Sequence, residues 1–334
     1  MIEHGGKLRA AARQWGIPLA QWLDLSTGIA PWPYPVPPIP LDCWQRLPED
    51  EDDLLPVART YYGSERLIAL PGSQAAILTL PRLRSPGTVA ILDPAYGEYA
   101  PAWRAAGHAV SGFAAEALGR MAEQANVVMV ANPNNPDGTR FAAADLLAAA
   151  AALQKRQGWL IVDEAFADAA PEQSLAAVAG GPDAPNLIVL RSLGKFFGLA
   201  GARVGFAIAH PDLLQALQEA IGPWAISHPA RFVACQALAN REWQAQQQTR
   251  LRGASERLAA LLQASGLVGE GVRLSGTALF QTLFTPHAEA LFLNLARQGI
   301  LIRHFPQWQA VRFGLPGVEM EWERLQRALT ASPS

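Results

Sequence analysis

The chain has 334 residues, of which 50% are hydrophobic and 17% charged, and its formal net charge at pH 7 is -2. This length exceeds the usual size of one domain, and the composition is that of a soluble globular protein rather than a disordered one. The near-neutral charge gives no reason to expect nucleic acid or an anionic membrane as a partner. We therefore expect a small-molecule ligand.

The N-terminus does not have the pattern expected of a signal peptide. Charged residues interrupt the first sixteen positions, and no run is long and apolar enough to cross a bilayer, so we predict a cytoplasmic protein. The two cysteines, Cys43 and Cys235, have no CxxC or zinc-site spacing, which argues against a disulfide framework or a bound metal.

The N-terminal part, 1–44, is predicted to be an arm. Residues 30–40 read APWPYPVPPIP, and proline at this density excludes a helix or a central strand. We expect an extended segment or linker here.

The next part, 45–222, is predicted to be a large domain with a mainly parallel sheet. Continuous apolar runs, typical of strands buried on both faces, occupy 88–93, 126–132, 159–166, 186–193 and 204–209. An alanine-rich helix is predicted over 141–158, between the second and third runs. Strand, helix and strand in succession favour an α/β fold.

The last part, 223–334, is predicted to be a smaller α+β domain. Residues 249–266 have the pattern of an amphipathic helix, and 276–284 and 299–305 have that of strands.

Polar residues lie at the ends of three of the predicted strands, where ligands bind in such sheets. These are the segment 132–138, Asp163, Ser192 and Lys195. Lys195 is one of only three lysines, with Lys7 and Lys155, in a chain rich in arginine. An amine can lose its proton and attack a carbonyl, whereas a guanidinium cannot, so Lys195 is a candidate for covalent chemistry.

Five motifs in order, ALPGSQAAI, DPAYGEY, ANPNNPDG, VDEAF and SLGKFFGLAGARVGF, resemble those of the fold type I pyridoxal phosphate enzymes, the aspartate aminotransferase superfamily (class I/II). The resemblance implies that Lys195 binds the cofactor aldehyde covalently and later transfers a proton, and that Asp163 keeps the pyridine nitrogen protonated. It also implies a homodimer.

The resemblance assigns the remaining cofactor contacts. Asn135 would bind the ring hydroxyl oxygen, or simply form a turn, and Tyr96 would stack on the ring, or pack in the core. The cofactor phosphate would be bound by residues at a helix N-terminus together with a hydroxyl and a guanidinium: Gly72, Ser73, Gln74, Ser192 and Arg203.

Four further residues are candidates for substrate binding. Arg312 in AVRFGLP matches the family arginine that binds a substrate carboxylate, and Arg303 matches a second one, with a surface salt bridge as its alternative. His4, in HGGKLRAAARQWGI, would lie near a substrate phosphate, or be a disordered terminal residue. Gly28 stands where asparagine is usual.

Within the superfamily the chain resembles threonine-phosphate decarboxylases of cobalamin biosynthesis and histidinol-phosphate aminotransferases. The N-terminal pattern, Phe166 in place of a tyrosine, and Trp224 in PWAISHPA favour the decarboxylase. Departures from the family are Leu279 and the segment 47–49, which reads LPE where Tyr-Pro-Asp is usual.

The expected function is therefore that of a lyase, which converts L-threonine O-3-phosphate to (R)-1-aminopropan-2-yl phosphate with pyridoxal 5'-phosphate. The alternative is a histidinol-phosphate-type aminotransferase. A noncatalytic module fused to a DNA-binding domain is disfavoured, because no basic N-terminal patch precedes the fold.

Overall fold

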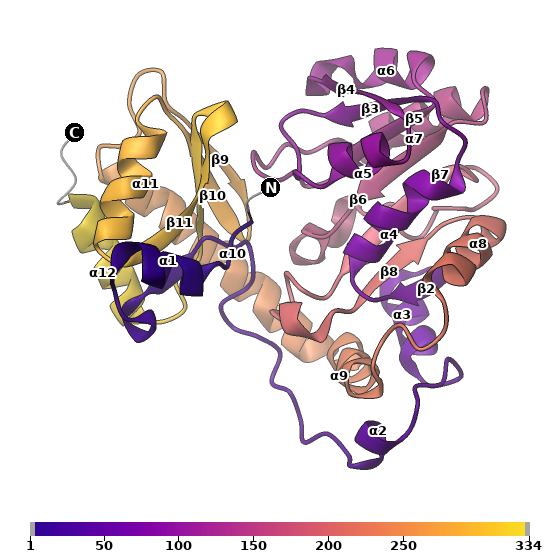
Figure 1. The fold of residues 1–334 in the computed structure, drawn as a ribbon, viewed down its shortest axis with the longest axis horizontal. Helices are drawn as coiled ribbons and strands as arrows, with labels where there is room; N and C mark the ends of the chain where they lie inside the picture. Colours follow the sequence, from indigo (N-terminus) through magenta and orange to yellow (C-terminus); the bar gives the residue numbers. More distant parts are fainter. Residues whose placement is uncertain (1–3, 331–334) are drawn as a thin grey trace. The chain divides into compact units, whose positions relative to one another are not determined.

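The computed structural model describes residues 4–330, and the chain divides into two compact units (Figure 1). Unit 1 takes its described residues from Met1–Trp32, Pro136–Gly138 and Gln247–Ser334, and unit 2 consists of Pro33–Asn135 and Thr139–Gln246. This division differs from the predicted boundaries at 44 and 222. The first segment joins the C-terminal unit because it adds a strand to that unit's sheet, and the helix His228–Ala239, which follows residue 222, packs within unit 2.

Unit 2 is built on a seven-stranded sheet with the order β2-β8-β7-β6-β5-β3-β4. The four neighbouring pairs from β7 to β4 are parallel, and β8 runs antiparallel to both β7 and β2. Its strands are β2 (Leu67–Leu70), β3 (Thr88–Leu92), β4 (Ala109–Phe113), β5 (Val127–Ala131), β6 (Trp159–Asp163), β7 (Leu187–Ser192) and β8 (Gly205–Ile208). The predicted mainly parallel sheet is thus confirmed.

The five apolar runs all form strands, because their side chains are buried on both faces of the sheet. The sequence did not predict the two edge strands. β4 is largely exposed and β2 is only four residues long, so neither has a continuous apolar pattern.

Helices cover the sheet of unit 2. One core cluster joins α4, α5 and α8 to alternate residues of the strands, so these helices cover the same face. The helices are α2 (Asp42–Gln45), α3 (Leu54–Tyr62), α4 (Ser73–Thr79), α5 (Tyr99–Ala105), α6 (Leu118–Gln124), α7 (Ala143–Gln154), α8 (Pro211–Ile221) and α9 (His228–Ala239). α7 is the predicted alanine-rich helix, shorter by a few residues at each end.

Unit 1 contains a five-stranded sheet with the order β1-β11-β12-β10-β9. Its strands are β1 (Leu23–Leu25), β9 (Arg273–Thr277), β10 (Phe280–Phe284), β11 (Ile300–Phe305) and β12 (Ala310–Gly314). β1 pairs in parallel with β11, and the other pairs are antiparallel. The predicted run 276–284 is therefore the turn and second strand of a hairpin.

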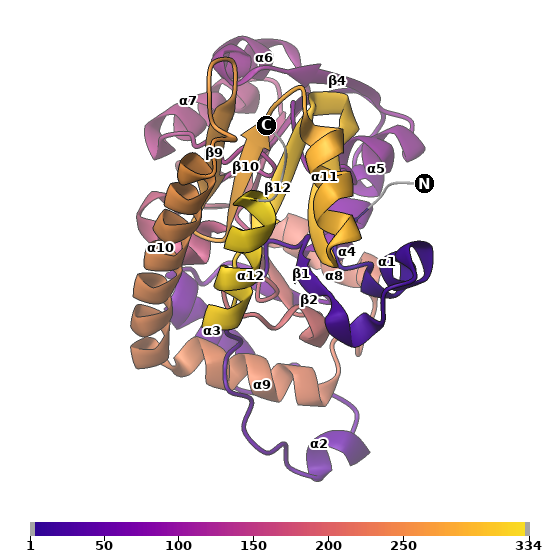
Figure 2. The ribbon, with the colours of Figure 1, turned by 90° about the vertical axis from the view of Figure 1, so that its left-hand side faces the viewer.

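Four helices accompany this sheet, namely α1 (Leu8–Trp15), α10 (Arg241–Ala264), α11 (Ala288–Arg297) and α12 (Glu319–Thr330). α11 packs on β11 and β12, α1 contacts α11, and α12 is seen between α10 and α11 in Figure 2. Ser255 of α10 donates to the carbonyl of Thr277 at the end of β9, at 2.8 Å. Within residues 4–330, no helix has the length and hydropathy needed to cross a membrane.

Candidate active site

The carboxyl ends of β5, β6 and β7 bring the main predicted residues of unit 2 to one edge of the sheet. Asp163 is the last residue of β6 and pairs in register with Ala131 of β5 and Leu190 of β7. Ser192 ends β7, and Lys195 follows three residues later. The charge of Lys195 lowers the pKa of Asp163, so the amine and the carboxylate lie within electrostatic range of each other.

Asp163 is a buried acid with two hydrogen-bond donors. Its carboxylate accepts a bond from the Tyr99 hydroxyl at 2.7 Å and another from the Ala165 amide at 2.9 Å. Burial raises the pKa of Asp163 above its ordinary value, although both donors and Lys195 act to lower it. Such a carboxylate is well suited to pair with a buried cationic ring nitrogen, which would compensate its desolvation.

Tyr99, the first residue of α5, binds the predicted acid Asp163 but was not among the predicted site residues. It is 1% exposed, and its ring meets that of Tyr96 edge to face with centroids 5.4 Å apart. Tyr96, the predicted stacking residue, belongs to the same motif, DPAYGEY. The spacing of the two tyrosines was the available signal, because residues three apart share a face where a helix begins.

Three of the predicted phosphate-binding residues, Gly72, Ser73 and Gln74, form the start of α4, and Arg203 lies beside them. Gly72 caps this helix with φ +77, and a Cβ built on it would lie 2.7 Å from Nη2 of Arg203. Arg203, with φ 55, directs Nη1 to the Ala200 carbonyl at 3.1 Å. The positive φ favours glycine here, and a larger side chain would displace the guanidinium from its place beside the first amides of the helix. Amide donors beside a cation suit a phosphate.

Gln74 connects this loop to Tyr96. The Tyr96 hydroxyl donates to Oε1 of Gln74 at 3.3 Å. Burial first, and then the carboxylates of Glu98 and Asp163, raise the pKa of Tyr96 to about 12, against the opposing charge of Arg203. Tyr96 is therefore a neutral phenol at pH 7.

Ser192 and Lys195 occupy the turn after β7. The amide of Gly194 donates to Oγ of Ser192 at 3.2 Å, which holds the turn. The Nζ atom of Lys195 lies 5.5 Å from the centre of the Phe166 ring. The phenylalanine that replaces a tyrosine in this chain thus faces the amine with its π surface.

Asn135 lies half-buried in the loop after β5. Asn132 fixes the base of this loop by two reciprocal bonds with the main chain of Phe141, at 3.2 and 3.0 Å. The side-chain amide of Asn134 donates to the Pro94 carbonyl at 2.7 Å. Asn135 is thereby held on a fixed loop at the same sheet edge as Asp163.

Unit 1 holds the predicted anion-binding arginines on neighbouring strands. Arg303 of β11 and Arg312 of β12 are paired in register. Arg312 is buried and donates from Nη2 to the Ser26 carbonyl at 3.1 Å. Burial, and then the charge of Arg303, lower the pKa of Arg312 to about 9. Two adjacent cations in a partly desolvated setting attract an anion.

The N-terminal segment lies against the same structure. A Cβ on Gly5 would come within 2.2 Å of the Ser26 carbonyl, and the amide of Gly6 donates to Oγ of Ser26 at 2.7 Å. Ser26 is itself held by Asp24, whose carboxylate accepts from the Ser26 amide and hydroxyl at 2.9 and 2.6 Å. His4 therefore begins a segment that is fixed beside Arg312, and Ser26 is a further residue that the sequence reasoning missed.

Gly28 is the remaining substrate candidate, and Leu279 and the segment 47–49 are the predicted departures from the family pattern. Gly28 is buried after β1, and Leu279 is fully buried at the turn between β9 and β10. Leu47 is exposed, and Glu49 forms an ion pair with Arg46 at 2.7 Å. Gly28 and Leu279 are thus buried, whereas Leu47 and Glu49 face solvent.

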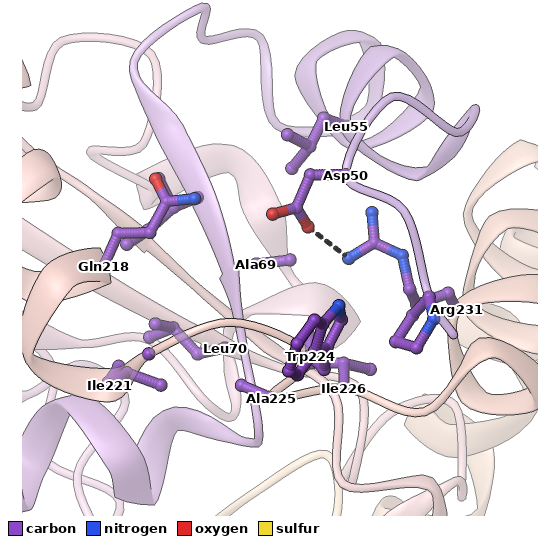
Figure 3. Close-up of a pocket in the computed structure, with 13 residues that line it drawn as sticks. Asp50, Leu55, Ala69, Leu70, Gln218, Ile221, Trp224, Ala225, Ile226 and Arg231 are labelled. Carbon is purple, nitrogen blue, oxygen red and sulfur yellow. Dashed lines mark hydrogen bonds and ion pairs between the residues drawn. The ribbon is translucent and has the colours of Figure 1, made fainter.

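Trp224 lines a separate hollow of about 50 Å³ in unit 2 (Figure 3). Asp50 and Arg231 also line it, and none of the predicted cofactor residues does. Trp224 has φ 57 and is 62% exposed. Its relation to the predicted chemistry stays a prediction.

The class I and II aminotransferase model matches residues 55–330, which include the lysine, the buried acid and the arginines described above. The chain belongs to this family. The family match confirms the expected fold class, and it accounts for the order of the motifs along the chain.

Individual members of the aminotransferase family differ in how much of this chain they resemble. The threonine-phosphate decarboxylase of Pseudomonas aeruginosa is 53% identical over 98% of this chain and 97% of its own length. The histidinol-phosphate aminotransferase of Yersinia pestis is 32% identical over 80% of this chain and 73% of its own. The crystal structure of histidinol-phosphate aminotransferase from Sinorhizobium meliloti, in complex with pyridoxal-5'-phosphate, has a TM-score of 0.81 at 22% identity and covers 99% of this chain and 97% of that chain.

Proposed function

We propose that the protein is a pyridoxal phosphate-dependent lyase that converts L-threonine O-3-phosphate to (R)-1-aminopropan-2-yl phosphate. The observation that carries this proposal is the 53% identity, over 98% of the chain, with a threonine-phosphate decarboxylase. The similarity to an aminotransferase is lower and covers less of the chain.

The residues of unit 2 fit pyridoxal phosphate. Lys195 would bind the aldehyde, Asp163 the ring nitrogen, and Gly72, Ser73 and Arg203 the phosphate. The space that Gly72 leaves beside Arg203 supports the last assignment, and the buried, doubly hydrogen-bonded carboxylate supports the second. When bound, the cofactor accepts the electron pair that remains on the substrate Cα as carbon dioxide leaves.

The protein's own residues would orient the substrate and move the protons. Arg312, with Arg303 and His4 as further candidates, would bind the carboxylate and the phosphate of the substrate by charge-assisted hydrogen bonds. Binding a remote phosphate can fix which Cα bond is cleaved, because it fixes the orientation of the substrate. Lys195 would return a proton to Cα after the carboxylate has left.

A single assay separates this function from that of an aminotransferase. Purified holoenzyme is incubated with O-phosphothreonine, and carbon dioxide and aminopropanol phosphate are measured, with histidinol phosphate plus 2-oxoglutarate as the parallel reaction. Carbon dioxide release supports the proposal. Formation of glutamate and a keto product without carbon dioxide would establish the alternative.

Borohydride reduction followed by peptide mapping tests the site itself. We expect the label on Lys195, with Lys155 unlabelled because it is the exposed C-cap of α7. A label on Lys155 would contradict the assignment.

The proposal includes a homodimer, a cytoplasmic location and a role in cobalamin biosynthesis. Support for the homodimer comes from a short stretch of unit 2 that exposes four large apolar side chains, Val36, Leu41, Trp44 and Leu47, at 50%, 70%, 65% and 62%. Exposed apolar side chains concentrated in one segment are typical of an interface. Sedimentation of wild type and Trp44→Glu tests this, since the variant should shift towards the monomer.

A further inference from the structure

A buried ionic cluster lies next to the predicted site residues of unit 2. Arg191 of β7 is 2% exposed, and its guanidinium donates to Glu164 at 2.6 Å and to Asp168. Glu164 also accepts from the Ser174 hydroxyl at 2.5 Å, and Asp168 accepts from the Tyr61 hydroxyl at 3.0 Å. One cation and two carboxylates are thus enclosed together.

Such a cluster is a poor means of stabilising a fold. Removing three charges from water is costly, and apolar side chains of similar volume often serve stability as well or better. The two carboxylates also exceed the single guanidinium in charge. The position of the cluster therefore suggests a purpose other than stability.

The cluster lies on the face of the sheet opposite to the predicted chemistry. Side chains alternate between the two faces along a strand. Ile188 and Leu190 of β7, and Ile161 of β6, belong to the core cluster that contains Tyr99, the partner of Asp163. Asp163 and Ser192 lie on the same face of the sheet as these residues. Arg191 and Glu164 are their neighbours in sequence, so they lie on the opposite face.

Arg191 links the end of β7 to the residues that follow β6, at the point where the two strands separate. Asp163 and Leu190 form their last register pair, and the amide of Glu164 donates to the Leu190 carbonyl at 2.9 Å. Beyond this point the chain leads to Phe166 on one side and to Lys195 on the other. From this position on, the side-chain hydrogen bonds of Arg191, rather than main-chain hydrogen bonds, connect the two segments.

The two carboxylates are placed at both ends of the segment that carries Phe166. Glu164 precedes Phe166 by two residues and Asp168 follows it by two, and Arg191 binds both. The Phe166 ring is the surface that faces Nζ of Lys195, at 5.5 Å. A single guanidinium therefore fixes the segment that faces the amine and the strand that leads to it.

We propose that Arg191, through Glu164 and Asp168, is a positioning residue that sets the placement of Lys195 relative to Asp163 and Phe166. This inference rests on the proposed function, because it assigns the cluster to the lysine that would bind the cofactor. Arg191 itself contacts neither substrate nor cofactor in this role.

The test uses variants that separate positioning from folding. Arg191→Met alone would leave two buried carboxylates, so the principal variant is Arg191→Met/Glu164→Gln/Asp168→Asn, in which no charge remains. Asp168→Asn is the second variant; it keeps one cation with one anion and releases only the far end of the Phe166 segment.

Unit 2 offers a matched control. Arg231 is 3% exposed and binds Asp52 through two bonds of 2.7 Å and Asp50 through one of 2.9 Å; Figure 3 shows the bond to Asp50. No predicted cofactor residue adjoins Asp50, Asp52 or Arg231 in sequence. The control variant is therefore Arg231→Met/Asp50→Asn/Asp52→Asn.

Four quantities are measured for each protein: melting temperature, the dissociation constant for pyridoxal phosphate by fluorescence quenching, kcat, and KM for O-phosphothreonine. We expect the neutral Arg191 variant to lose about 10- to 100-fold in kcat, as misplacement of reacting groups does, with KM within about twofold. Its affinity for pyridoxal phosphate should fall about tenfold, which corresponds to a loss of about 1.4 kcal/mol of binding free energy. Asp168→Asn should show a smaller loss in the same direction, and the control should match the wild type.

The outcomes are distinct. Arg191 and Asp168 variants with the kcat and cofactor affinity of the wild type would overturn the inference alone, and so would equal losses in the control. If the wild type takes up no pyridoxal phosphate, the proposed function fails and this inference with it. If it takes up the cofactor but does not release carbon dioxide, only the substrate assignment fails, and cofactor affinity still tests Arg191.

Discussion

Asp163 in unit 2 and Arg312 in unit 1 are both buried charges, but their surroundings differ. Asp163 accepts from two donors and lies near an amine, whereas Arg312 donates to the Ser26 carbonyl and is paired in register with a second arginine. Burial shifts the pKa of each towards the neutral form, upward for Asp163 and downward to about 9 for Arg312. Burial of each charge therefore disfavours the folded state.

The two shifts act in opposite pH ranges. The pKa of Asp163 is higher in the folded protein than in the unfolded chain, so the unfolded chain releases its proton first as pH rises, and the free energy of unfolding falls between the two pKa values. For Arg312 the folded pKa is the lower one, so the folded protein releases its proton first, and the free energy of unfolding rises above about pH 9. The comparison teaches that burial of either charge alone lowers stability, as we expect for two regions that would bind ligands of opposite charge.

The largest effect is expected for Asp163→Asn. Loss of one partner of a buried charge pair costs about 3–5 kcal/mol, so kcat for carbon dioxide release should fall by about three orders of magnitude. The same change should raise the melting temperature of the cofactor-free protein at pH 7, because it removes a desolvated carboxylate. A variant that loses activity and is also less stable would contradict the statement that the buried charge of Asp163 destabilises the cofactor-free protein.

Arg312→Gln should mainly affect substrate binding. Hydrogen bonds to charged groups contribute about 1.5–3 kcal/mol, so KM for O-phosphothreonine should rise about 10- to 100-fold. Pyridoxal phosphate affinity should stay within about twofold. Arg297→Gln, which changes an exposed arginine of α11, is the control, and a KM unchanged in both variants would remove Arg312 from the site.

Tyr99→Phe removes one of the two donors that bind Asp163. We expect kcat to fall about tenfold, in proportion to the loss of one hydrogen bond to a charged group. Tyr34→Phe, at another buried tyrosine of unit 2, should leave kcat unchanged. Equal kcat values in wild type and Tyr99→Phe would show that the Tyr99 bond has no influence on Asp163.

The smallest effect is expected for Arg303→Gln in the absence of ligand. Like charges paired across strands destabilise a sheet by about 0.2–1 kcal/mol, so urea unfolding should show a slight gain in stability. Inorganic phosphate should raise the melting temperature of wild type more than that of the variant. A loss of stability without ligand would mean that Arg312 does not repel Arg303.

The sequence predicted those parts of the fold and the site that depend on local pattern and chain order. Asp163 and Lys195 could be located because Asp163 ends one buried apolar strand and Lys195 follows shortly after another, and parallel strands end at one edge. Tyr99 could not be chosen over Tyr96, since only the structure shows which hydroxyl reaches the acid. Arg191 could not be predicted, because it is a single charged residue within an apolar run, and the sequence does not indicate that it pairs with Glu164 and Asp168.

The N-terminal elements escaped prediction for a different reason. β1 has three residues, too few for a periodic pattern, and its partner β11 lies near the other end of the sequence. Pairing over such a distance is decided by tertiary contacts, which no local window of sequence contains.

That pairing also dictates an order of events during biosynthesis. The ribosome makes Leu23–Leu25 early, but the backbone of these residues meets its partners only after Ile300–Ile302 have been translated. The strand must wait, with its amides and carbonyls bonded to water, while residues 33–246 of unit 2 emerge and can already fold. Closure of the smaller sheet is thus a late step that joins the first residues made to nearly the last.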